Sequence, residues 1–256
     1  MSATDGRVFR LDGQLALVTG GGSGLGLAIS QAMVEAGARV AIVGRNAEHL
    51  KRARVQLGPE AQELVHDVTD LSSIPVLVHD VEERYGPVDI LVNNAGQHLK
   101  KPALETSDQE LADVLATHVF GSYALCRECG RRMMDRGQGS ILLVVSMAAL
   151  FGIPQVSAYT VAKAGLLGLT RALATEFSLR GVRVNAIAPG WIETEMTRQA
   201  HEGDPSRRAR ILQRTPLGRL GDTSDVGHAA VYLSSPAARF ITGIVLPVDG
   251  GVSIGF

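Results

Sequence analysis

Cysteine, net charge and long apolar runs are all scarce in this sequence of 256 residues. Its 25 basic and 26 acidic residues give a formal net charge of -1, so the charge balance favours neither nucleic acid nor an anionic membrane as a partner. The two cysteines, Cys126 and Cys129, lie three residues apart in a stretch with helical spacing. A redox pair or half of a metal site has that spacing, but no second cluster of Cys or His lies nearby. We therefore interpret them as ordinary buried thiols and expect no metal.

No apolar run reaches the roughly 18 residues that a membrane-spanning helix needs. Residues 1–13, which we treat as an N-terminal extension, carry Asp5 and Asp12 and lack the apolar core of a signal peptide. We therefore expect a cytoplasmic protein. The length suits a single hydrophobic core, so we expect residues 14–256 to form one domain that binds a dinucleotide and carries the chemistry.

Short apolar runs alternate with longer amphipathic stretches along the chain. The runs are nearly continuous in hydrophobic residues, as strands buried on both faces are. The predicted strands are residues 14–19, 39–43, 63–65, 90–92, 141–145, 182–187 and 244–248. The predicted helices are residues 25–36, 47–57, 71–85, 107–136, 158–179 and 224–233. This alternation predicts an α/β fold of the Rossmann type, doubly wound, with a seven-stranded parallel sheet and helices on both faces.

One segment, residues 192–217, interrupts this rhythm. It is rich in charged residues and has little strand signal. A helical lid over a polar cleft and a solvated surface insertion both have such a composition. The sequence leaves these two interpretations open.

A glycine-rich turn joins the first predicted strand to the first predicted helix. Gly20, Gly24 and Gly26, with Ser23 and Leu25 between them, stand at this junction. Glycines there allow positive φ and let backbone N–H groups approach a diphosphate at the positive end of the helix dipole. The turn therefore predicts a dinucleotide site in the first βαβ unit.

The end of the second predicted strand bears on the choice of cofactor. An acid about twenty residues beyond the glycines would bind the ribose hydroxyls of NAD, but the residues here are Gly44, Arg45 and Asn46. The guanidinium of Arg45 can hold a 2′-phosphate through two charge-assisted hydrogen bonds. We expect NADP(H) as the preferred cofactor, with NAD(H) as an alternative, unless Arg45 only faces solvent.

Tyr159 and Lys163 are four residues apart in a predicted helix, so they share one face about 6 Å apart along the axis. A free phenol titrates near 10, and an adjacent ammonium favours the phenolate. The spacing therefore predicts a lowered pKa for Tyr159, which would exchange a proton with a substrate oxygen during hydride transfer.

Four motifs in this order and spacing resemble the short-chain dehydrogenase/reductase family over nearly the whole chain. They are Gly20-x-x-x-Gly24-x-Gly26, Asn93-Asn94-Ala95-Gly96, Tyr159-x-x-x-Lys163 and Pro189-Gly190. The resemblance implies a nicotinamide-dependent oxidoreductase. Ser146, thirteen residues before Tyr159, matches the family's serine that donates a hydrogen bond to the reacting oxygen.

The same resemblance implies further cofactor contacts, with Lys163 holding the nicotinamide ribose. Asp67 and Val68 match positions that border the adenine, although Asp67 alone has the appearance of a helix cap. The positions matched to the nicotinamide side and its carboxamide are Asn94, Ala95, Gly96, Pro189, Gly190, Ile192 and Thr194.

One position departs from the family pattern. The family often has an asparagine in the long fourth helix, in Asn-x-x-Gly, where this chain has His118. A histidine there can organise water, shuttle protons because it titrates near neutrality, or serve as a buried spacer. Our hypothesis is that activity survives with an altered pH profile.

The segments that would roof the cleft bear on the substrate. The stretch from Gln97 to Pro102 is polar and basic, and segments near Trp191 and Arg214 are similar to those of gluconate 5-dehydrogenase-like members. Lys100 and Lys101 suit a sugar acid such as gluconate or 5-ketogluconate, but equally they can be solvated surface charges. The alternatives are a 3-oxoacyl-carrier-protein reductase and a catalytically silent cofactor-binding regulator or scaffold.

The long helices of the second half carry apolar residues on more than one face, which predicts burial between subunits. Relatives in the family pair such helices, so we expect a homotetramer. The residues that motivate this are Leu111, Val114, Leu115, Leu166, Leu167, Leu169 and Leu173.

Overall fold

Seven strands form one parallel sheet in the order β3-β2-β1-β4-β5-β6-β9. The computed structural model describes residues 6–194 and 205–255. The strands are β1 (Leu15–Thr19), β2 (Arg39–Gly44), β3 (Ala61–Val65), β4 (Ile90–Asn93), β5 (Gly139–Val144), β6 (Val182–Pro189) and β9 (Val245–Val248). The predicted doubly wound sheet is confirmed. The order reverses between β1 and β4, so a ligand cleft is expected outside the carboxyl ends of these strands.

The strands are hydrophobic along their whole length because both faces of the sheet are covered. In β1, Leu15 and Leu17 belong to one core cluster, whereas Ala16 and Val18 belong to the other. This alternation follows from the two-residue repeat of a strand.

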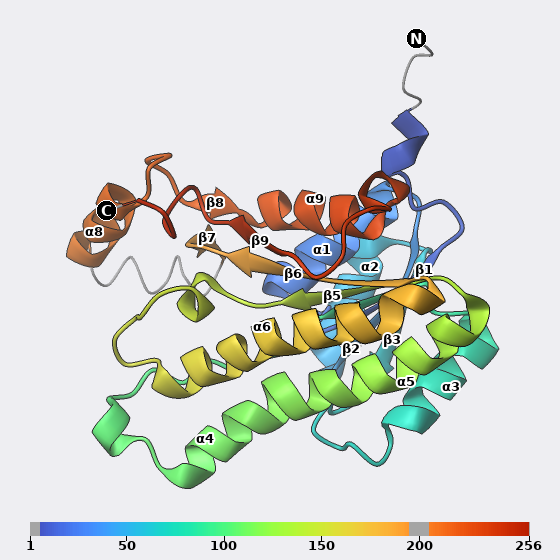
Figure 1. The fold of residues 1–256 in the computed structure, drawn as a ribbon, viewed down its shortest axis with the longest axis horizontal. Helices are drawn as coiled ribbons and strands as arrows, with labels where there is room; N and C mark the ends of the chain where they lie inside the picture. The colour runs from blue at the N-terminus through green and yellow to red at the C-terminus, as the bar shows by residue number, and fades with distance from the viewer. Residues whose placement is uncertain (1–5, 195–204, 256) are drawn as a thin grey trace.

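Helices cover both faces of the sheet (Figure 1). The helices α1 (Gly24–Glu35), α2 (Ala47–Leu57) and α9 (Thr223–Ser234) contribute to one core cluster. The helices α3 (Ile74–Tyr85), α5 (Gly121–Arg136) and α6 (Ser157–Phe177) contribute to the other. The predicted helical layers are therefore confirmed, with boundaries that differ by up to three residues.

The long helix predicted over residues 107–136 is interrupted. It consists of α4 (Asp108–Leu115), a π-helical turn η3 (Ala116–Phe120) and α5. Ser107 and Glu110 form a reciprocal capping box that fixes the start of α4. The π-helical turn contains His118 and rotates its side chain relative to a regular helix, as such turns commonly do at functional sites.

The segment predicted as a lid or an insertion contains β7 (Ile192–Glu193) and α8 (Pro205–Arg214). Residues 195–204, in its middle, lie outside the described residues, as do residues 1–5 of the predicted N-terminal extension. β7 pairs in parallel with β8 (Gly221–Asp222), which ties the start of the segment to the loop that follows α8.

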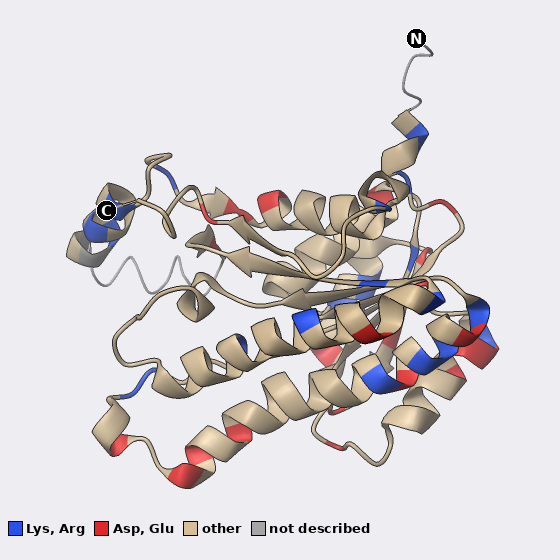
Figure 2. Cartoon of the chain, in the orientation of Figure 1, with Lys and Arg blue, Asp and Glu red and all other residues tan. Residues whose placement is uncertain are grey.

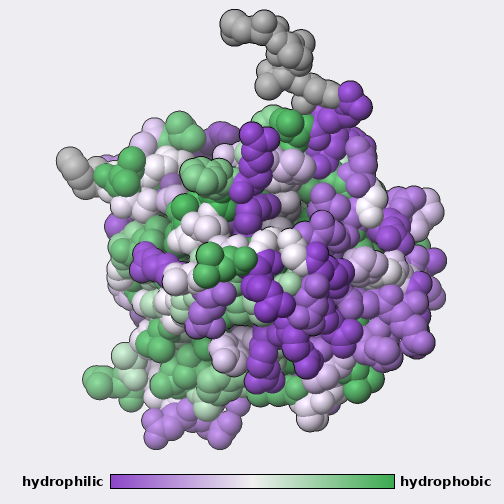
Figure 3. Space-filling view, turned by 45° about the vertical axis from the view of Figure 1, so that its right-hand side comes forward, coloured by the Kyte–Doolittle hydropathy of each residue, from purple (hydrophilic) through white to green (hydrophobic). Residues whose placement is uncertain are grey.

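Charged residues gather at the C-terminal end of α5 and on the adjacent α3, whereas α6 and the first half of α5 carry few (Figure 2). Glu82 of α3 accepts hydrogen bonds from Arg132 and Arg136 of α5 at 3.1 and 3.0 Å. The space-filling view shows the same hydrophilic side of the molecule (Figure 3). These ion pairs join α3 to α5 at a distance from the expected cleft.

Cys126 and Cys129 are free and buried in α5, where burial raises the pKa of the Cys126 thiol to about 12. The interpretation as ordinary buried thiols is confirmed. Among the described helices, none combines the length and apolar character required to cross a bilayer.

Candidate active site

The turn between β1 and α1 has room only for glycine at two of its positions. Gly20 has φ +66°, and a Cβ atom there would lie 2.8 Å from Nδ2 of Asn94. A Cβ atom on Gly26 would collide with the carbonyl group of Gly20. The glycines therefore permit a close approach of backbone to backbone that any side chain would block.

The Asn-Asn-Ala-Gly motif is pinned to this turn. Oγ1 of Thr19 accepts hydrogen bonds from the backbone N–H groups of Asn94 and Ala95, both at 3.0 Å. Nδ2 of Asn94 donates to the carbonyl oxygen of Thr19 at 3.0 Å. Two motifs 75 residues apart in the sequence are thus held together by hydrogen bonds.

The start of α1 fits a dinucleotide diphosphate. Ser23 is the N-cap residue but makes no side-chain capping hydrogen bond. Ser23 and Gly24 are both exposed, so the start of the helix, where backbone N–H groups lack intrahelical partners, is open to solvent. Together with the glycine cradle, this open helix start matches the requirements of a phosphate group.

Arg45 and Asp67 face each other at the ends of β2 and β3. Nη1 of Arg45 lies 3.7 Å from Oδ2 of Asp67, and the Arg45 side chain is 69% exposed. Oδ1 of Asp67 accepts hydrogen bonds from N and Oγ1 of Thr69 at 2.9 and 2.8 Å. Burial opposes ionisation of Asp67, but the bonds from Thr69 and the charge of Arg45 hold its pKa below the usual value. Arg45 therefore has a partner rather than only solvent.

The remaining positions matched to the cofactor differ in exposure. The side chain of Val68 is 7% exposed and packs in the core cluster beside α5. Gly190 donates its N–H to the carbonyl oxygen of Val248, and a Cβ atom on Gly190 would lie 2.6 Å from Cα of Asp249. Pro189 ends β6, and Ile192 is buried in β7, two residues before the half-buried Thr194.

Ser146, Tyr159 and Lys163 come together after β5. Ser146 accepts a hydrogen bond from the N–H of Ala148 at 3.1 Å and is hydrogen-bonded to the phenol of Tyr159. Nζ of Lys163 donates to the carbonyl oxygen of Val144 at 2.7 Å and lies 5.5 Å from the ring centroid of Tyr159. The strand end and the first two turns of α6 thus place a hydroxyl, a phenol and an amine in one cluster.

The expected lowering of the Tyr159 pKa is wrong in this structure. Burial raises the pKa of Tyr159, and the hydrogen bond with Ser146 offsets only part of that rise. Burial also lowers the pKa of Lys163 to about 7, so this amine carries only part of a charge at neutral pH. Helical spacing predicted the pairing of the two side chains, but their desolvation decides the direction of the shift.

His118 is 2% exposed and lies against the ring of Tyr159, with centroids 5.5 Å apart and the rings at 83°. Its Nε2 lies 2.8 Å from O and 3.1 Å from N of Gln97. Its buried Nδ1 has no hydrogen-bond partner among the described residues. Burial lowers the pKa of His118 to about 3, with the charge of Lys163 acting in the same direction, so the expectation of titration near neutrality is wrong.

From the sequence, the stretch after the Asn-Asn-Ala-Gly motif is identified only as polar and basic. In the structure, the exposed ring of His98 contacts the ring of Tyr159, with centroids 5.2 Å apart. Arg214 at the end of α8 lies over the ring of Phe151, 4.6 Å from its centroid. The nearness of His98 to the motif in sequence was the available signal, whereas the contact of Arg214 depends on tertiary packing.

Lys101 is not an unpaired cation at the cleft. Its Nζ lies 2.9 Å from Oε1 and 3.0 Å from Oε2 of Glu110. Lys100 is exposed. Of the two lysines predicted to suit a carboxylate, one is therefore already neutralised by a carboxylate of this chain.

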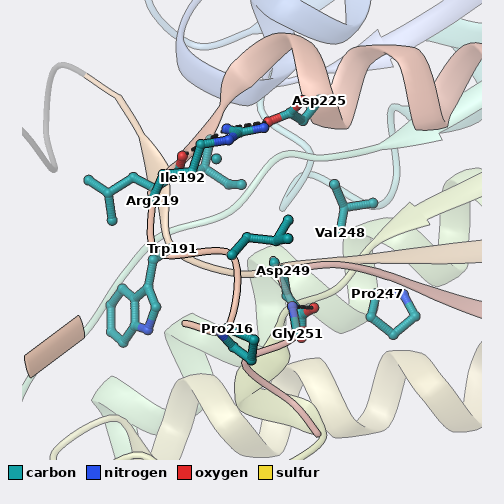
Figure 4. Close-up of a pocket in the computed structure, with 13 residues that line it drawn as sticks. Trp191, Ile192, Pro216, Arg219, Asp225, Pro247, Val248, Asp249 and Gly251 are labelled. Carbon is teal, nitrogen blue, oxygen red and sulfur yellow. Dashed lines mark hydrogen bonds and ion pairs between the residues drawn. The ribbon is translucent and has the colours of Figure 1, made fainter. Parts of the chain in front are cut away.

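A pocket of about 560 Å³ lies at the start of β7 (Figure 4). Trp191, Ile192 and Asp249 line it, and Arg219 is held at its edge by a 3.2 Å contact with Asp225. None of Ser146, Tyr159 and Lys163 lines it. The pocket thus borders the position matched to the carboxamide rather than the cluster of Ser146, Tyr159 and Lys163.

Comparisons with known proteins agree with this geometry. Residues 20–253 match a family described as Enoyl-(Acyl carrier protein) reductase. The chain is 44% identical over 250 residues to galactitol 2-dehydrogenase (L-tagatose-forming) from Cereibacter sphaeroides, covering 96% of this chain and 98% of that enzyme. It is 37% identical over 242 residues to 3-oxoacyl-[acyl-carrier-protein] reductase from Vibrio harveyi, covering 94% of this chain and 98% of that enzyme.

Among solved structures, gluconate 5-dehydrogenase from Burkholderia cenocepacia in complex with NADP and tartrate superposes with a TM-score of 0.92. It is 32% identical, and the match covers 98% of this chain and 99% of that chain. The glycine cradle, the pinned Asn-Asn-Ala-Gly motif and the cluster after β5 are thus found in a chain whose relatives are named oxidoreductases over nearly its full length. The protein belongs to the short-chain dehydrogenase/reductase family and is an oxidoreductase.

Proposed function

We propose that this enzyme prefers NADP(H) and oxidises a secondary hydroxyl of a small polyhydroxylated substrate, or reduces the corresponding ketone. The observation that carries the proposal is the cluster of Ser146, Tyr159 and Lys163 beside the glycine cradle. NADP(H) supplies the hydride donor or acceptor when bound. Gly20, Gly26 and the open start of α1 would hold its diphosphate, and Arg45 its 2′-phosphate.

Tyr159 exchanges the proton that must accompany hydride transfer. Because burial raises its pKa, the phenol is protonated at neutral pH and can donate to a developing alkoxide during ketone reduction. In the oxidative direction it must first lose that proton, so oxidation is favoured by higher pH. The Ser146 hydroxyl orients the same substrate oxygen, and Lys163 stabilises the phenolate to the extent that its amine is charged.

In this mechanism, His118 has a structural role and holds a neighbouring loop in place. With a pKa of about 3 it is neutral at working pH, and its hydrogen bonding to Gln97 holds the loop that follows β4. Its buried Nδ1 is suited to holding a water molecule beside Lys163. The His118 ring itself stays neutral and takes up no proton in this role. This is the role we assign to the position where the family often has asparagine.

A neutral alditol fits the cleft better than a sugar acid because Glu110 already neutralises Lys101. The relative that acts on galactitol agrees with this choice. A sugar acid such as gluconate is the second candidate, because Arg214, which lies over the ring of Phe151, would supply a cation.

A substrate panel tests the proposal. We expect NADP⁺-linked oxidation of galactitol or another alditol at a higher kcat/KM than oxidation of gluconate, and little reduction of an acetoacetyl thioester with NADPH. A preference for the thioester would instead identify a 3-oxoacyl-carrier-protein reductase. Tight NADPH binding without turnover of any alcohol or carbonyl would identify a silent regulator or scaffold.

We also propose a cytoplasmic homotetramer with one domain per subunit. Val114, Leu166 and Leu173, which motivated that expectation, are buried within the chain itself. Support comes instead from exposed apolar side chains on η3, α5 and α6, namely Phe120, Tyr123 and Val161, which are 48–52% exposed. Size-exclusion chromatography with light scattering tests this, and a stable monomer would contradict it.

A further inference from the structure

The segment from Gln97 to Lys101 has no helix or strand, yet both of its ends are held. At one end, the backbone of Gln97 lies within hydrogen-bonding distance of Nε2 of His118. At the other end, the N–H of Lys101 donates to the carbonyl oxygen of Gln155 at 2.7 Å. Gln155 adopts φ +65°, which is uncommon for a residue other than glycine and marks a locally strained backbone at the rim of the cleft.

The side chains of this segment add two further anchors. Leu99 packs against the small apolar cluster of Val114, Ala158 and Ala162, which lies between α4 and α6. Nζ of Lys101 contacts both carboxylate oxygens of Glu110. A five-residue loop is thereby fixed by α4, by η3 and by the loop before α6.

His98 is presented by this fixed segment. Its ring lies against that of Tyr159 at a tilt of 48°, while the buried His118 approaches the same phenol ring edge-on. His98 is exposed, whereas His118 is not. Tyr159 therefore contacts two imidazoles, the buried one of His118 and the solvent-exposed one of His98, which a substrate can reach.

The position of His98 suits contact with a substrate atom beside the reacting one. The reacting oxygen must meet the hydroxyl groups of Tyr159 and Ser146, which are hydrogen-bonded to each other. Because the centroid of the His98 ring lies 5.2 Å from that of the phenol ring, His98 is close enough to contact the part of a substrate next to the reacting atom. An imidazole can donate or accept a hydrogen bond, as a hydroxyl can.

We propose that His98 is a specificity-determining residue that hydrogen-bonds a substrate hydroxyl adjacent to the carbinol or carbonyl carbon at Tyr159. The inference rests on the proposed polyol function and deepens it. The enzyme then selects substrates with a vicinal diol or an α-hydroxyketone. The braces at Gln97 and Lys101 keep the imidazole in place before the substrate arrives, which reduces the ordering cost of binding.

A pair of substrates that differ by one hydroxyl tests the proposal. We expect His98→Phe, which keeps an aromatic ring against Tyr159, to lower kcat/KM for 2,3-butanediol about tenfold, mainly through KM, while kcat/KM for 2-butanol changes by less than about twofold. His98→Asn, which can donate and accept, should recover part of the loss. His79→Phe is the matched control, because His79 is an exposed histidine on α3 whose nearest ionic partner is Glu83.

Two failures are distinguishable. If the wild-type enzyme oxidises no polyol, the proposed function falls and this inference falls with it. If the wild type oxidises polyols but His98→Phe lowers kcat/KM for both alcohols equally, or for neither, only the role of His98 is overturned. An unchanged Kd for NADPH excludes an indirect effect through the cofactor.

The contact between Glu110 and Lys101, which holds one end of the segment, provides a second test. Glu110→Gln retains a side chain suited to the capping box but weakens the contact with Lys101. We expect it to lower kcat/KM for 2,3-butanediol in the wild-type background and to add nothing in the His98→Phe background. Additive effects would show that the segment does not act through His98.

Discussion

The two ends of the predicted cleft differ in how far their charged side chains are exposed to solvent. At the catalytic end, Lys163 is 4% exposed and is held by the carbonyl oxygen of Val144 at 2.7 Å. At the end matched to the adenosine, Arg45 is 69% exposed and lies 3.7 Å from Asp67. Burial raises the pKa of Tyr159 and lowers that of Lys163, whereas Arg45 forms its ion pair in contact with solvent. A buried setting strengthens electrostatic interactions, which suits the proton transfer that we propose for Tyr159, and solvent weakens the ion pair at Arg45, which suits its proposed contact with a phosphate.

The largest expected effect is at the catalytic end. Tyr159→Phe removes the proton donor but retains the ring, so we expect kcat to fall by about 10³-fold or more in both directions. Fluorescence titration should show an unchanged Kd for NADPH. Retention of more than about a tenth of the wild-type kcat would remove Tyr159 from the reaction.

Because the amine of Lys163 is buried, the stability of the folded protein should depend on pH. The pKa of Lys163 falls from an ordinary 10.5 to about 7 on folding, so between these values the unfolded chain binds more protons and stability rises with pH. The cost of burying the ammonium is complete below pH 7 and is relieved as the pH rises towards 10.5. We expect the unfolding free energy of Lys163→Met relative to wild type to decrease by about 1–3 kcal/mol between pH 6 and pH 9.

Denaturant titrations at several pH values measure this difference. Lys51→Met is the control, because Lys51 is an exposed lysine on α2. A difference independent of pH would show that Lys163 is charged throughout, and the proposed contrast between the two ends of the cleft would lose its electrostatic basis.

At the end that carries Arg45, the preference for NADPH over NADH should depend on the charge of a single side chain. We expect Arg45→Ala to lower the ratio of kcat/KM for NADPH to that for NADH about tenfold, because one charge-assisted contact to a phosphate is lost. Arg54→Ala is the matched control, since Arg54 is exposed on α2 and lies 3.9 Å from Glu63. A wild-type enzyme that uses NADH as well as NADPH would contradict the preference itself.

The smallest effect is expected at His118. Because burial lowers its pKa to about 3, His118 stays neutral across the assay range and its replacement removes no titration. We expect His118→Asn to change kcat by less than about threefold and to leave the shape of the profile between about pH 6 and 9 unchanged. A displaced pH optimum would restore the proton-relay hypothesis.

Local patterns predicted most of the architecture. Continuous apolar runs predicted the seven parallel strands because both sheet faces are covered, and the i, i+4 spacing of Tyr159 and Lys163 predicted that their side chains lie close together. The π-helical turn that carries His118 was not predicted, since the amphipathic pattern of residues 107–136 is uninterrupted and the turn depends on neighbouring elements.

Sequence by itself determined the alternation of strands and helices and the glycine-rich turn between the first strand and the first helix, because these follow from short-range periodicity and spacing. Only the tertiary structure decided that Glu110 neutralises Lys101, that Asp67 faces Arg45, and that His98 lies on Tyr159. It also reversed the expected pKa shift of Tyr159. The physical reason is common to all four: charge pairing and desolvation depend on atoms brought together from distant parts of the chain, which spacing along one helix does not encode.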